Sequence, residues 1–314
     1  RGRSAQTAGR GWYIRPYQPG DEKGIVQLFK KVFGVDRSLK RWYWQYRDNP
    51  IGDQYIRVAV TETGSLVGHY AGLPVLATWG GERLVLTQVV DVMADPAVRG
   101  GLSRSSGIFS QMLVCYIQEC LGPGRGALGF GFPPIGNLRL GRLLGYRDLH
   151  RVQALTKCID VSRTFSLPMF IATPGWVVEE VATLHAEADR LWLRCQPELP
   201  VAIIRDSQYL EWRYRQHPEV RYRVIAVRRR LSMGWAGMAV MRLGIGKELA
   251  FLGHDDTSAC IVDWLVPASE TRAAALLLAG CEAIGRENGM RRLSAWFRPD
   301  SVQWNFFSAR GFQP

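Results

Sequence analysis

The sequence predicts an α/β protein with two tandem domains, each a mixed, mostly antiparallel sheet flanked by helices. Three landmarks recur in the same order about 170 residues apart, a spacing far longer than the repeat of a solenoid. They are a Trp-x-Tyr-Arg-x-x-Pro motif, an Asp within an apolar stretch and a closing Gly-aromatic pair, at residues 44–50 and 212–218, 91 and 263, and 145–146 and 311–312. The chain is therefore expected to contain a duplicated domain.

Length, composition and charge limit the classes of protein to which this chain can belong. The 314 residues suit two domains of about 150 residues each. With 47% hydrophobic and 22% charged residues, no long apolar run and no secretory signal, we expect a cytoplasmic globular protein that contacts no membrane. The six cysteines form no CxxC pair and no zinc spacing, so reduced thiols and no metal are expected. The net charge of +12 is not concentrated in one block, which favours a phosphate-bearing cofactor over nucleic acid.

Apolar periodicity and turn residues predict the order of helices and strands in the first half. Residues 1–11 are polar and basic and are expected to form a disordered tail. Helices are expected where apolar residues recur at helical spacing between capping and breaking residues, at 21–33, 38–47, 107–121 and 137–144. Strands are expected where apolar runs lie between turn residues, at 13–16, 56–61, 66–71, 84–92, 128–132 and within 146–159.

The second half repeats this order. Helices are expected at residues 177–193, 207–215 and 270–286, and strands at 221–228, 235–243, 249–252, 261–266 and 292–297. The predicted boundaries are a first domain at 12–161, a linker at 162–174 and a second domain at 175–314. The second half stops at its Gly-aromatic pair, so either its last strands are missing or another segment completes its sheet.

A strand, loop and helix at residues 90–109 are the best candidate for a functional site. The loop is rich in Gly and Ser, so several backbone N–H groups can point at one place, and Gly107 opens a helix whose N-terminus carries partial positive charge. Such a helix start binds phosphate, and Arg99 and Arg104 add bidentate cationic donors. The alternative is a flexible surface loop.

A set of short motifs in residues 13–160 resembles the GNAT superfamily of acyl-coenzyme A transferases. The motifs are Ile14-Arg15-Pro16 with Asp21, Asp95-Pro96 with Arg99-Gly100, the helix entry at Ser106-Gly107, and Asn137 with Gly145-Tyr146. The resemblance implies that a strand backbone pairs with the pantetheine arm of the coenzyme and that the following loop binds its pyrophosphate. The positions implied for acetyl-CoA, or another acyl-CoA, are Val92, Met93, Ala94, Arg99, Gly100, Arg104, Ser105, Ser106, Gly107, Ile108 and Asn137. The tandem arrangement is similar to two-domain GNAT enzymes of the enhanced-intracellular-survival type.

The chain departs from the family pattern in three places. Residues 100–106 lengthen the loop, and Phe109 stands where a small residue is usual. Gly141 occupies the position of the family's usual Tyr general acid. The second copy runs from Val266-Pro267 into a helix without a single Gly. We therefore expect the second copy to bind no coenzyme and to act as a scaffold or substrate wall.

N-acyl transfer needs a neutral amine, a polarised thioester carbonyl and a proton for the leaving thiolate. Asp91 lies in an apolar strand and could act as a base with a pKa raised by burial, although its recurrence as Asp263 favours a structural role. His69 titrates near neutral pH, with a core histidine as the alternative. Tyr146 and Tyr116 are possible proton donors. The predicted catalytic set is Asp91, His69 and Tyr146.

The leading hypothesis is an N-acyltransferase that uses an acyl-CoA, with acetyl-CoA as the first choice. The acceptor would be a small amine such as an amino sugar, and transfer would be direct within a ternary complex. One alternative is a non-catalytic coenzyme-binding or structural protein, motivated by the altered loop and the absent Tyr. The other is an aminoacyl-tRNA-dependent transferase, a class that also pairs two such domains.

Overall fold

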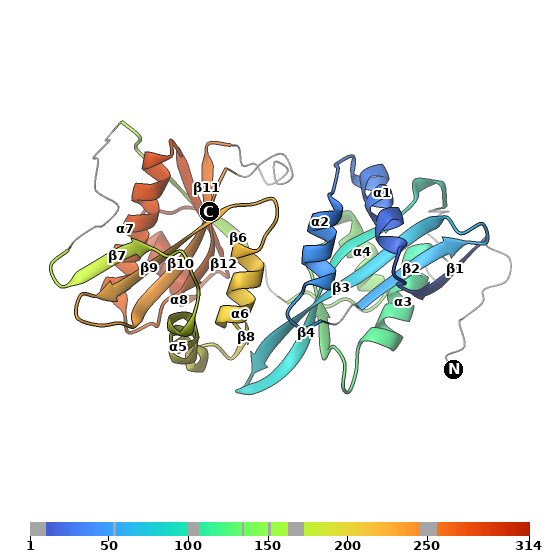
Figure 1. The fold of residues 1–314 in the computed structure, drawn as a ribbon, viewed down its shortest axis with the longest axis horizontal. Helices are drawn as coiled ribbons and strands as arrows, with labels where there is room; N and C mark the ends of the chain where they lie inside the picture. The colour runs from blue at the N-terminus through green and yellow to red at the C-terminus, as the bar shows by residue number, and fades with distance from the viewer. Residues whose placement is uncertain are drawn as a thin grey trace. The chain divides into compact units, whose positions relative to one another are not determined.

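The computed structural model describes residues 11–52, 55–98, 107–133, 135–149, 152–162, 173–244 and 256–314. These residues form two compact units, each with its own six-stranded mixed sheet. The first unit runs to Asp148 and also takes in Val201–Ile204, and the second comprises Leu149–Pro200 and Arg205–Pro314. Two mixed sheets flanked by helices confirm the predicted fold class (Figure 1).

The first unit contains strands from the N-terminal half and one from the C-terminal half. The strands are β1 (Trp12–Pro16), β2 (Tyr55–Thr61), β3 (Leu66–Trp79), β4 (Glu82–Ala94), β5 (Leu128–Phe130) and β8 (Val201–Ile203). The helical segments are α1 (Asp21–Phe33), α2 (Leu39–Trp42), the π-helical turn η1 (Tyr43–Arg47), the 3-10 turn η2 (Pro96–Val98), α3 (Ile108–Cys120) and α4 (Ile135–Leu143).

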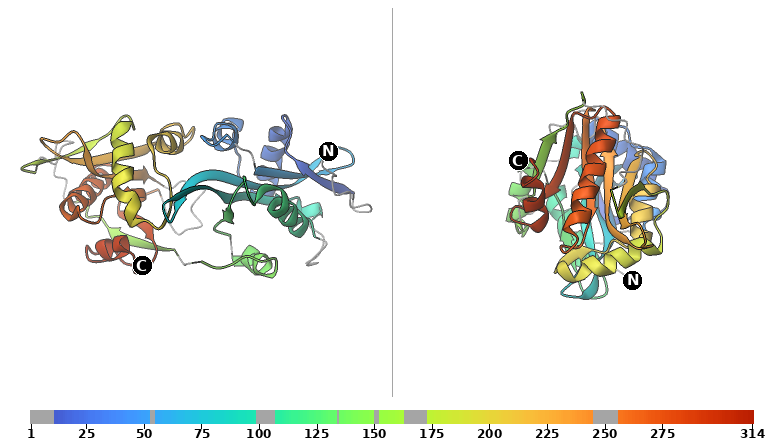
Figure 2. Two further views of the ribbon diagram at one scale, coloured as in Figure 1. Left: turned by 90° about the horizontal axis from the view of Figure 1, so that it is seen from below. Right: turned by 90° about the vertical axis from the view of Figure 1, so that its left-hand side faces the viewer.

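The first sheet has the order β1-β2-β3-β4-β5, with β8 paired to the far end of β3. All neighbours are antiparallel except β4 and β5, which are parallel. Helices α1 and α2 cover one face of the sheet, whereas α3 and α4 lie on the opposite face (Figure 2, left). The sheet of the first unit therefore lies between two layers of helices.

Local sequence signals explain the first helix and the close packing of α3. Helix α1 has Asp21 in its acidic first turn and Gly34 as a left-handed C-cap at φ 72°, both of which favour its observed bounds. Gly68 on β3 faces α3, where an added Cβ would lie 2.7 Å from the Met112 sulfur. The glycine therefore lets α3 approach the sheet closely, and Ile108 and Met112 are buried there.

The second unit repeats the layout. Its strands are β6 (Gln153–Cys158), β7 (Trp176–Glu180), β9 (Tyr222–Arg229), β10 (Trp235–Leu243), β11 (Ser258–Leu265) and β12 (Arg292–Phe297). Its helical segments are α5 (Ala186–Cys195), the 3-10 turn η3 (Gln196–Glu198), α6 (Ser207–Leu210), the π-helical turn η4 (Glu211–Arg215), α7 (Thr271–Glu287) and α8 (Val302–Ser308). The sheet order is β7-β9-β10-β11-β12-β6, again with one parallel pair, β11 and β12.

The repeated sequence motif has a repeated structure. Ser38 caps α2 through its side chain, and Asp206 caps α6 in the same way. Each short helix then widens into a π-helical turn, closed by Asp48 N–H to Tyr43 and by Gln216 N–H to Glu211. The same local geometry, followed by strands in the same order, agrees with the duplication that the sequence predicts.

Two expected elements and one expected domain boundary differ from the structure. Residues 176–180, expected at the start of a helix, form β7, because they pair antiparallel with β9. Strand β6, expected within the first domain, lies at the edge of the second sheet because it pairs with β12. The division of the units therefore falls at Asp148/Leu149, before the predicted boundary at residues 161–162. The alternative in which another segment completes the second sheet is the one observed. The strand expected at 249–252 lies outside the described residues.

Candidate active site

Strand β4 has an open edge in its second half. It pairs in parallel with β5 only from Leu86 to Gln88, and no other described strand pairs with that side of residues 89–93. The side chains of Gln88–Val92 are accordingly half-buried, whereas those of β3 are almost all buried. An extended ligand can add to such an edge through main-chain hydrogen bonds. The positions expected from the sequence for the pantetheine arm, Val92, Met93 and Ala94, lie at the end of this strand.

A β-bulge interrupts β4 at the start of that edge. Ala71 pairs with Val90 and His69 pairs with Met93, so Asp91 and Val92 together oppose the single residue Tyr70. Asp91 takes the left-handed conformation, with φ 52°. Bulges of this kind redirect the strand and commonly lie beside functional sites. The orientation of the peptide groups after Asp91 therefore depends on the bulge as well as on the pairing with β3.

The Asp91 carboxylate lies in a buried polar cluster that we call the first clasp: Arg37, Gln45, Tyr46 and Asp91. Its Oδ2 atom accepts hydrogen bonds from the Arg37 guanidinium, from Gln45 Nε2 at 3.0 Å and from Tyr46 at 2.6 Å. Burial alone would raise the pKa of Asp91, but Arg37 and the other donors hold it below its usual value. Burial raises the pKa of the Tyr46 hydroxyl well above its usual value. The carboxylate is thus held ionised, which argues against a proton acceptor tuned to neutral pH.

An equivalent cluster, the second clasp, lies in the second unit and comprises Arg205, Tyr214 and Asp263. Arg205 Nε lies 3.0 Å from Asp263 Oδ1, and the Tyr214 hydroxyl lies 3.0 Å from Asp263 Oδ2. The arginines that complete the two clasps were not singled out from the sequence. A signal was present, because Arg37-Ser38 and Arg205-Asp206 stand at the same distance before the two copies of the Trp motif.

His69 is fully buried on β3. Its Nδ1 lies 2.7 Å from the backbone carbonyl oxygen of Asp91, and burial lowers its pKa. Because a carbonyl only accepts, the neutral ring must carry its proton on Nδ1. The other nitrogen, Nε2, has no hydrogen-bond partner among the described residues. His69 therefore touches the bulge directly but has no exposed surface for a substrate.

Tyr146 fills the space that opens beside Gly141. A Cβ added to Gly141 would lie 2.3 Å from the Tyr146 ring. The Tyr146 hydroxyl lies 2.8 Å from that of Tyr70, the residue opposite the bulge, and the ring packs in the same apolar cluster as Val92. Burial raises the pKa of Tyr146, so the phenol stays protonated at neutral pH. In the second unit the residue after the closing Gly is Phe312, which has no hydroxyl.

Two of the remaining predicted coenzyme residues, Gly107 and Ile108, lie at the start of α3. Gly107 is its extended N-cap, and Ile108 is buried in the core against β3, so its side chain does not line an open site. Arg99, Gly100, Arg104, Ser105 and Ser106 lie outside the described residues. Asn137 lies in α4, with its side chain outside the described part. The Tyr116 hydroxyl donates to Thr87 inside the core. Across the described ranges, no group of three or more His, Cys, Asp or Glu side chains is arranged to hold a metal ion.

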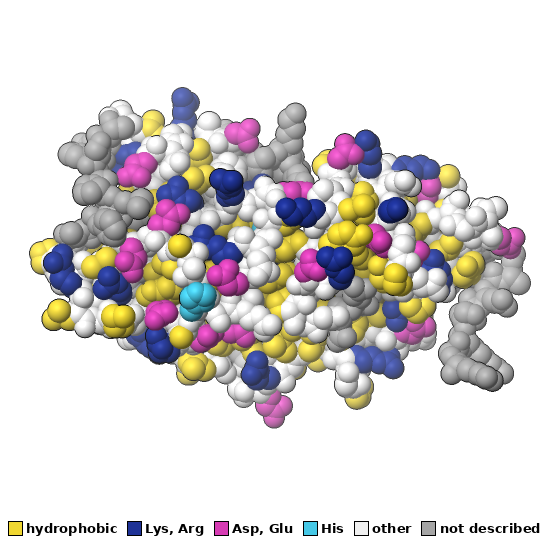
Figure 3. Space-filling model, viewed as in Figure 1, with side chains coloured by type: hydrophobic (Ala, Val, Ile, Leu, Met, Phe, Trp, Pro, Cys, Tyr) yellow, Lys and Arg dark blue, Asp and Glu magenta, His cyan; other side chains and the backbone are white. Residues whose placement is uncertain are grey.

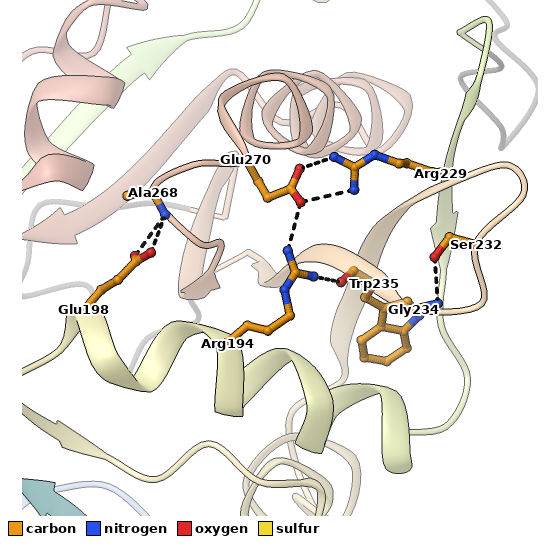
Figure 4. Close-up of polar contacts among 8 residues, drawn as sticks. All are labelled: Arg194, Glu198, Arg229, Ser232, Gly234, Trp235, Ala268 and Glu270. Carbon is orange, nitrogen blue, oxygen red and sulfur yellow. Dashed lines mark hydrogen bonds and ion pairs between the residues drawn. The ribbon is translucent and has the colours of Figure 1, made fainter. Parts of the chain in front are cut away.

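The second unit fills the matching position at the start of α7 with its own carboxylates (Figure 4). Glu198 accepts the Ala268 N–H, with its two oxygens at 2.9 and 3.2 Å. Glu270, immediately before α7, accepts from Arg194 at 2.8 Å and from both terminal nitrogens of Arg229 at 2.9 and 3.1 Å. The Glu198 carboxylate thus takes up a backbone N–H group before this helix start, and Glu270 takes up the donors of Arg194 and Arg229, so these groups are not available to a pyrophosphate.

Comparison with known proteins gives one family-model match, in the first half of the chain. Residues 13–131 match the family model described as an acetyltransferase (GNAT) domain. A search of curated proteins gave no match.

Three solved structures share the fold over both units. A probable N-acyltransferase of unknown function from Enterococcus faecalis V583 has a TM-score of 0.64 at 14% identity, covering 93% of this chain and 67% of that one. A GCN5-related glucosamine N-acetyltransferase region of a fungal multi-domain β-N-acetylglucosaminidase gives 0.61 at 12%, covering 98% and 37%. The N-myristoyltransferase of Saccharomyces cerevisiae with bound myristoyl-CoA gives 0.58 at 10%, covering 98% and 79%. The chain is thus shorter than each of these proteins.

Proposed function

Residues 13–131 of this chain match the acetyltransferase (GNAT) domain model, and from that match we propose that the first unit acylates an amine. The donor is an acyl-CoA, with acetyl-CoA as the first choice, and the acceptor is a small molecule such as an amino sugar. The observation that carries the proposal is the open edge of β4 beside the bulge at Asp91, because it offers main-chain hydrogen bonds to an extended donor.

The donor would lie along β4 and reach the start of α3. Its pantetheine arm pairs with the backbone of residues 89–93, and its pyrophosphate lies where α3 presents unpaired N–H groups. Arg99 and Arg104, which the sequence places in the connecting loop, supply the cationic donors. The second unit has Glu198 and Glu270 at the matching place, so we expect one coenzyme per chain.

In the transfer step the neutral amine attacks the thioester carbon, a C–N bond forms and the C–S bond breaks. Backbone N–H groups after the bulge polarise the carbonyl oxygen, as such groups do in other acyl transfers. Tyr146 gives its phenolic proton to the departing thiolate and is reprotonated from the proton that the amine loses. Val92 packs in the same cluster as Tyr146, which brings the acid to this part of β4.

A direct transfer is favoured over a covalent acyl-enzyme. Cys115 and Cys120 on α3 are the nearest thiols in sequence to the site, and burial raises the pKa of both, that of Cys120 to about 11. Thiols with raised pKa values are poor nucleophiles at neutral pH. The acyl group is therefore expected to pass directly from the donor to the amine, with no cysteine intermediate.

An amino sugar is the first acceptor to test because a fungal structure with the same fold is described as a glucosamine N-acetyltransferase region. A polyanionic acceptor such as tRNA is less well supported. On the face drawn in Figure 3, Lys and Arg side chains are interspersed with Asp and Glu and form no single block.

We also propose a cytoplasmic location. All six cysteines are free thiols, a state that a reducing compartment maintains. None of the described helices has the length and apolar character that a membrane span requires.

Calorimetric titration with acetyl-CoA tests the proposal. We expect micromolar affinity, about one site per chain, and at least a tenfold loss in the Arg99→Ala/Arg104→Ala variant, because each arginine gives charge-assisted contacts to phosphate. Release of free thiol with glucosamine then reports turnover. An absence of heat at millimolar acetyl-CoA, or two equal sites per chain, would contradict the proposal. Salt-sensitive binding of tRNA in place of coenzyme would favour the aminoacyl-tRNA alternative.

A substitution at Gly141 tests the role of Tyr146 without changing the Tyr146 residue itself. Replacing a helical Gly by Ala normally stabilises a protein by about 0.5–1 kcal/mol. Here Gly141→Ala is expected to destabilise by about 1–3 kcal/mol and to lower kcat, because the new Cβ displaces the Tyr146 ring. Thermal unfolding and initial rates measure both effects. Gly24→Ala in α1 is the matched control, since its Cβ would meet Leu66 at an ordinary 3.4 Å. A stabilised, fully active Gly141→Ala protein would contradict the assignment.

A further inference from the structure

The two units share a clasp but differ at the bulge. In the second sheet, Val240 pairs with Asp263 and Met241 pairs with Ile261, so the extra residue there is Val262 and not the clasp aspartate. Among the described non-glycine residues, only Asp91 and Asp300 have positive φ, so Asp263 lacks the left-handed conformation of Asp91. The Arg-Tyr-Asp clasp alone therefore does not produce the left-handed bulge.

The residue that differs is the one that contacts the bulge from β3. His69 pairs with Met93, two residues after Asp91, and Met238 pairs with Leu265, two residues after Asp263. Both His69 and Met238 are fully buried, but only His69 can donate a hydrogen bond. Within the described ranges, both units leave the second half of the central strand unpaired on this side, β4 beyond Gln88 and β11 beyond Ile261. The histidine–carbonyl bond is present in the unit whose closing aromatic residue is a phenol, and absent from the unit that has carboxylates at its helix start.

The geometry around His69 explains why a left-handed aspartate persists. A non-glycine residue in this conformation costs free energy and is retained only where its surroundings fix it. The Asp91 side chain is fixed by the first clasp, and its carbonyl oxygen is fixed by Nδ1 of His69 at 2.7 Å. The Tyr46 ring, which belongs to the clasp, also stands edge-on to the imidazole, with centroids 6.1 Å apart. Side chain and carbonyl of Asp91 are held from one connected cluster.

We propose that His69 is a positioning residue that holds the Asp91 carbonyl in the left-handed bulge and thereby directs the peptide groups of Val92 and Met93 along the open edge. The inference rests on the proposed function for its catalytic consequence, but not for its structural one. His69 itself touches no substrate, because it is fully buried. Burial lowers the pKa of His69, so the ring is held neutral, with its single proton on Nδ1.

Two substitutions at one position test the proposal. His69→Met installs the residue of the second unit and removes the donor, whereas His69→Asn keeps an N–H donor near the position of Nδ1. We expect His69→Met to lower kcat at least tenfold with an unchanged KM for the amine, because small misplacements of the groups that hold a reacting centre have effects of this size. His69→Asn should recover kcat to within about threefold of the wild type.

Amide hydrogen exchange in the free protein gives a readout that does not depend on activity. Faster exchange at Val92 and Met93 in His69→Met, reversed in His69→Asn, supports positioning even where the wild type transfers no acyl group. An inactive wild type would therefore overturn the proposed function and leave this inference standing on exchange. Identical behaviour of the two variants, or reduced thermal stability with unchanged exchange at both residues, would overturn it and leave His69 as a core-filling residue.

Discussion

Replacing Tyr146 by Phe is expected to lower kcat about a hundredfold while changing the affinity for acetyl-CoA little, because a positioned general acid contributes at least that much. The hydroxyl lies 2.8 Å from that of Tyr70, opposite the bulge, and the ring occupies the space beside Gly141. We propose that Tyr146 provides the phenol that Gly141 lacks. The second unit already carries the equivalent of this substitution in Phe312.

The pH profile follows from the direction of the Tyr146 pKa. Burial raises it, and the hydrogen bond with Tyr70 lowers it by a smaller amount. Because the donor must be protonated and its pKa lies above the ordinary value, the rate should not fall on the alkaline side from Tyr146 ionisation below about pH 10. A loss of activity with an apparent pKa near 8 that disappears in Tyr146→Phe would contradict this prediction.

Tyr116→Phe is the matched control for Tyr146→Phe. It removes a buried phenolic oxygen from the same apolar cluster, where Tyr116 donates to Thr87 at 2.8 Å. We expect a similar loss of stability for the two variants and near-normal kcat for Tyr116→Phe. Rates from stopped-flow thiol release, normalised to the folded fraction, separate the two. Equal kcat values for both variants would remove Tyr146 from the transfer step.

Asp91→Asn is expected to destabilise the first unit by about 3–5 kcal/mol, because it leaves the charge of a buried arginine uncompensated. The side chains of Arg37 and Asp91 are only 10% and 11% exposed. Asp263→Asn is the matched control in the second unit. We expect a smaller loss there, because the Arg205 side chain is 27% exposed and keeps more of its hydration. Chemical denaturation monitored by hydrogen exchange assigns each loss of stability to its unit.

The pH dependence of stability supplies a second readout for Asp91. Its folded-state pKa is depressed, so its stabilising contribution is present above the unfolded value of about 4 and is lost as pH falls through the folded value. The wild type should therefore lose stability on acidification more steeply than Asp91→Asn. An Asp91→Asn protein of normal stability that lost activity would instead support the proton-acceptor role considered from the sequence.

Much of the fold could be predicted from the sequence because local periodicity and turn chemistry decide it. Helix α1 and strand β12 follow from their apolar patterns and flanking residues. The repeated Trp motif predicts a helix in both halves, and the structure shows that each of these helices ends in a π-helical turn. Strand β7 and the sheet to which β6 belongs could not be assigned correctly, because both depend on pairing with distant strands rather than on short local patterns.

The candidate site was predictable only in part for a similar reason. Asp91, His69 and Tyr146 were identifiable by residue type, but their roles depend on partners far along the chain. Arg37 and Asp91 are 54 residues apart, and Tyr70 and Tyr146 are 76 apart. Gly141 alone indicates an absent acid. Only the structure shows that the Tyr146 ring packs against Gly141, and this contact is the basis for proposing Tyr146 as the acid.

Hydrogen–deuterium exchange with and without saturating acetyl-CoA tests most directly whether the open edge of β4 binds the donor. We predict protection of the amides of residues 89–94 and of the first turn of α3, because a ligand on that edge pairs with them, and no protection in residues 258–270 of the second unit. Protection in residues 258–270 in place of 89–94, or no protection in either segment at a concentration that saturates transfer, would contradict the assignment of the coenzyme to the first unit.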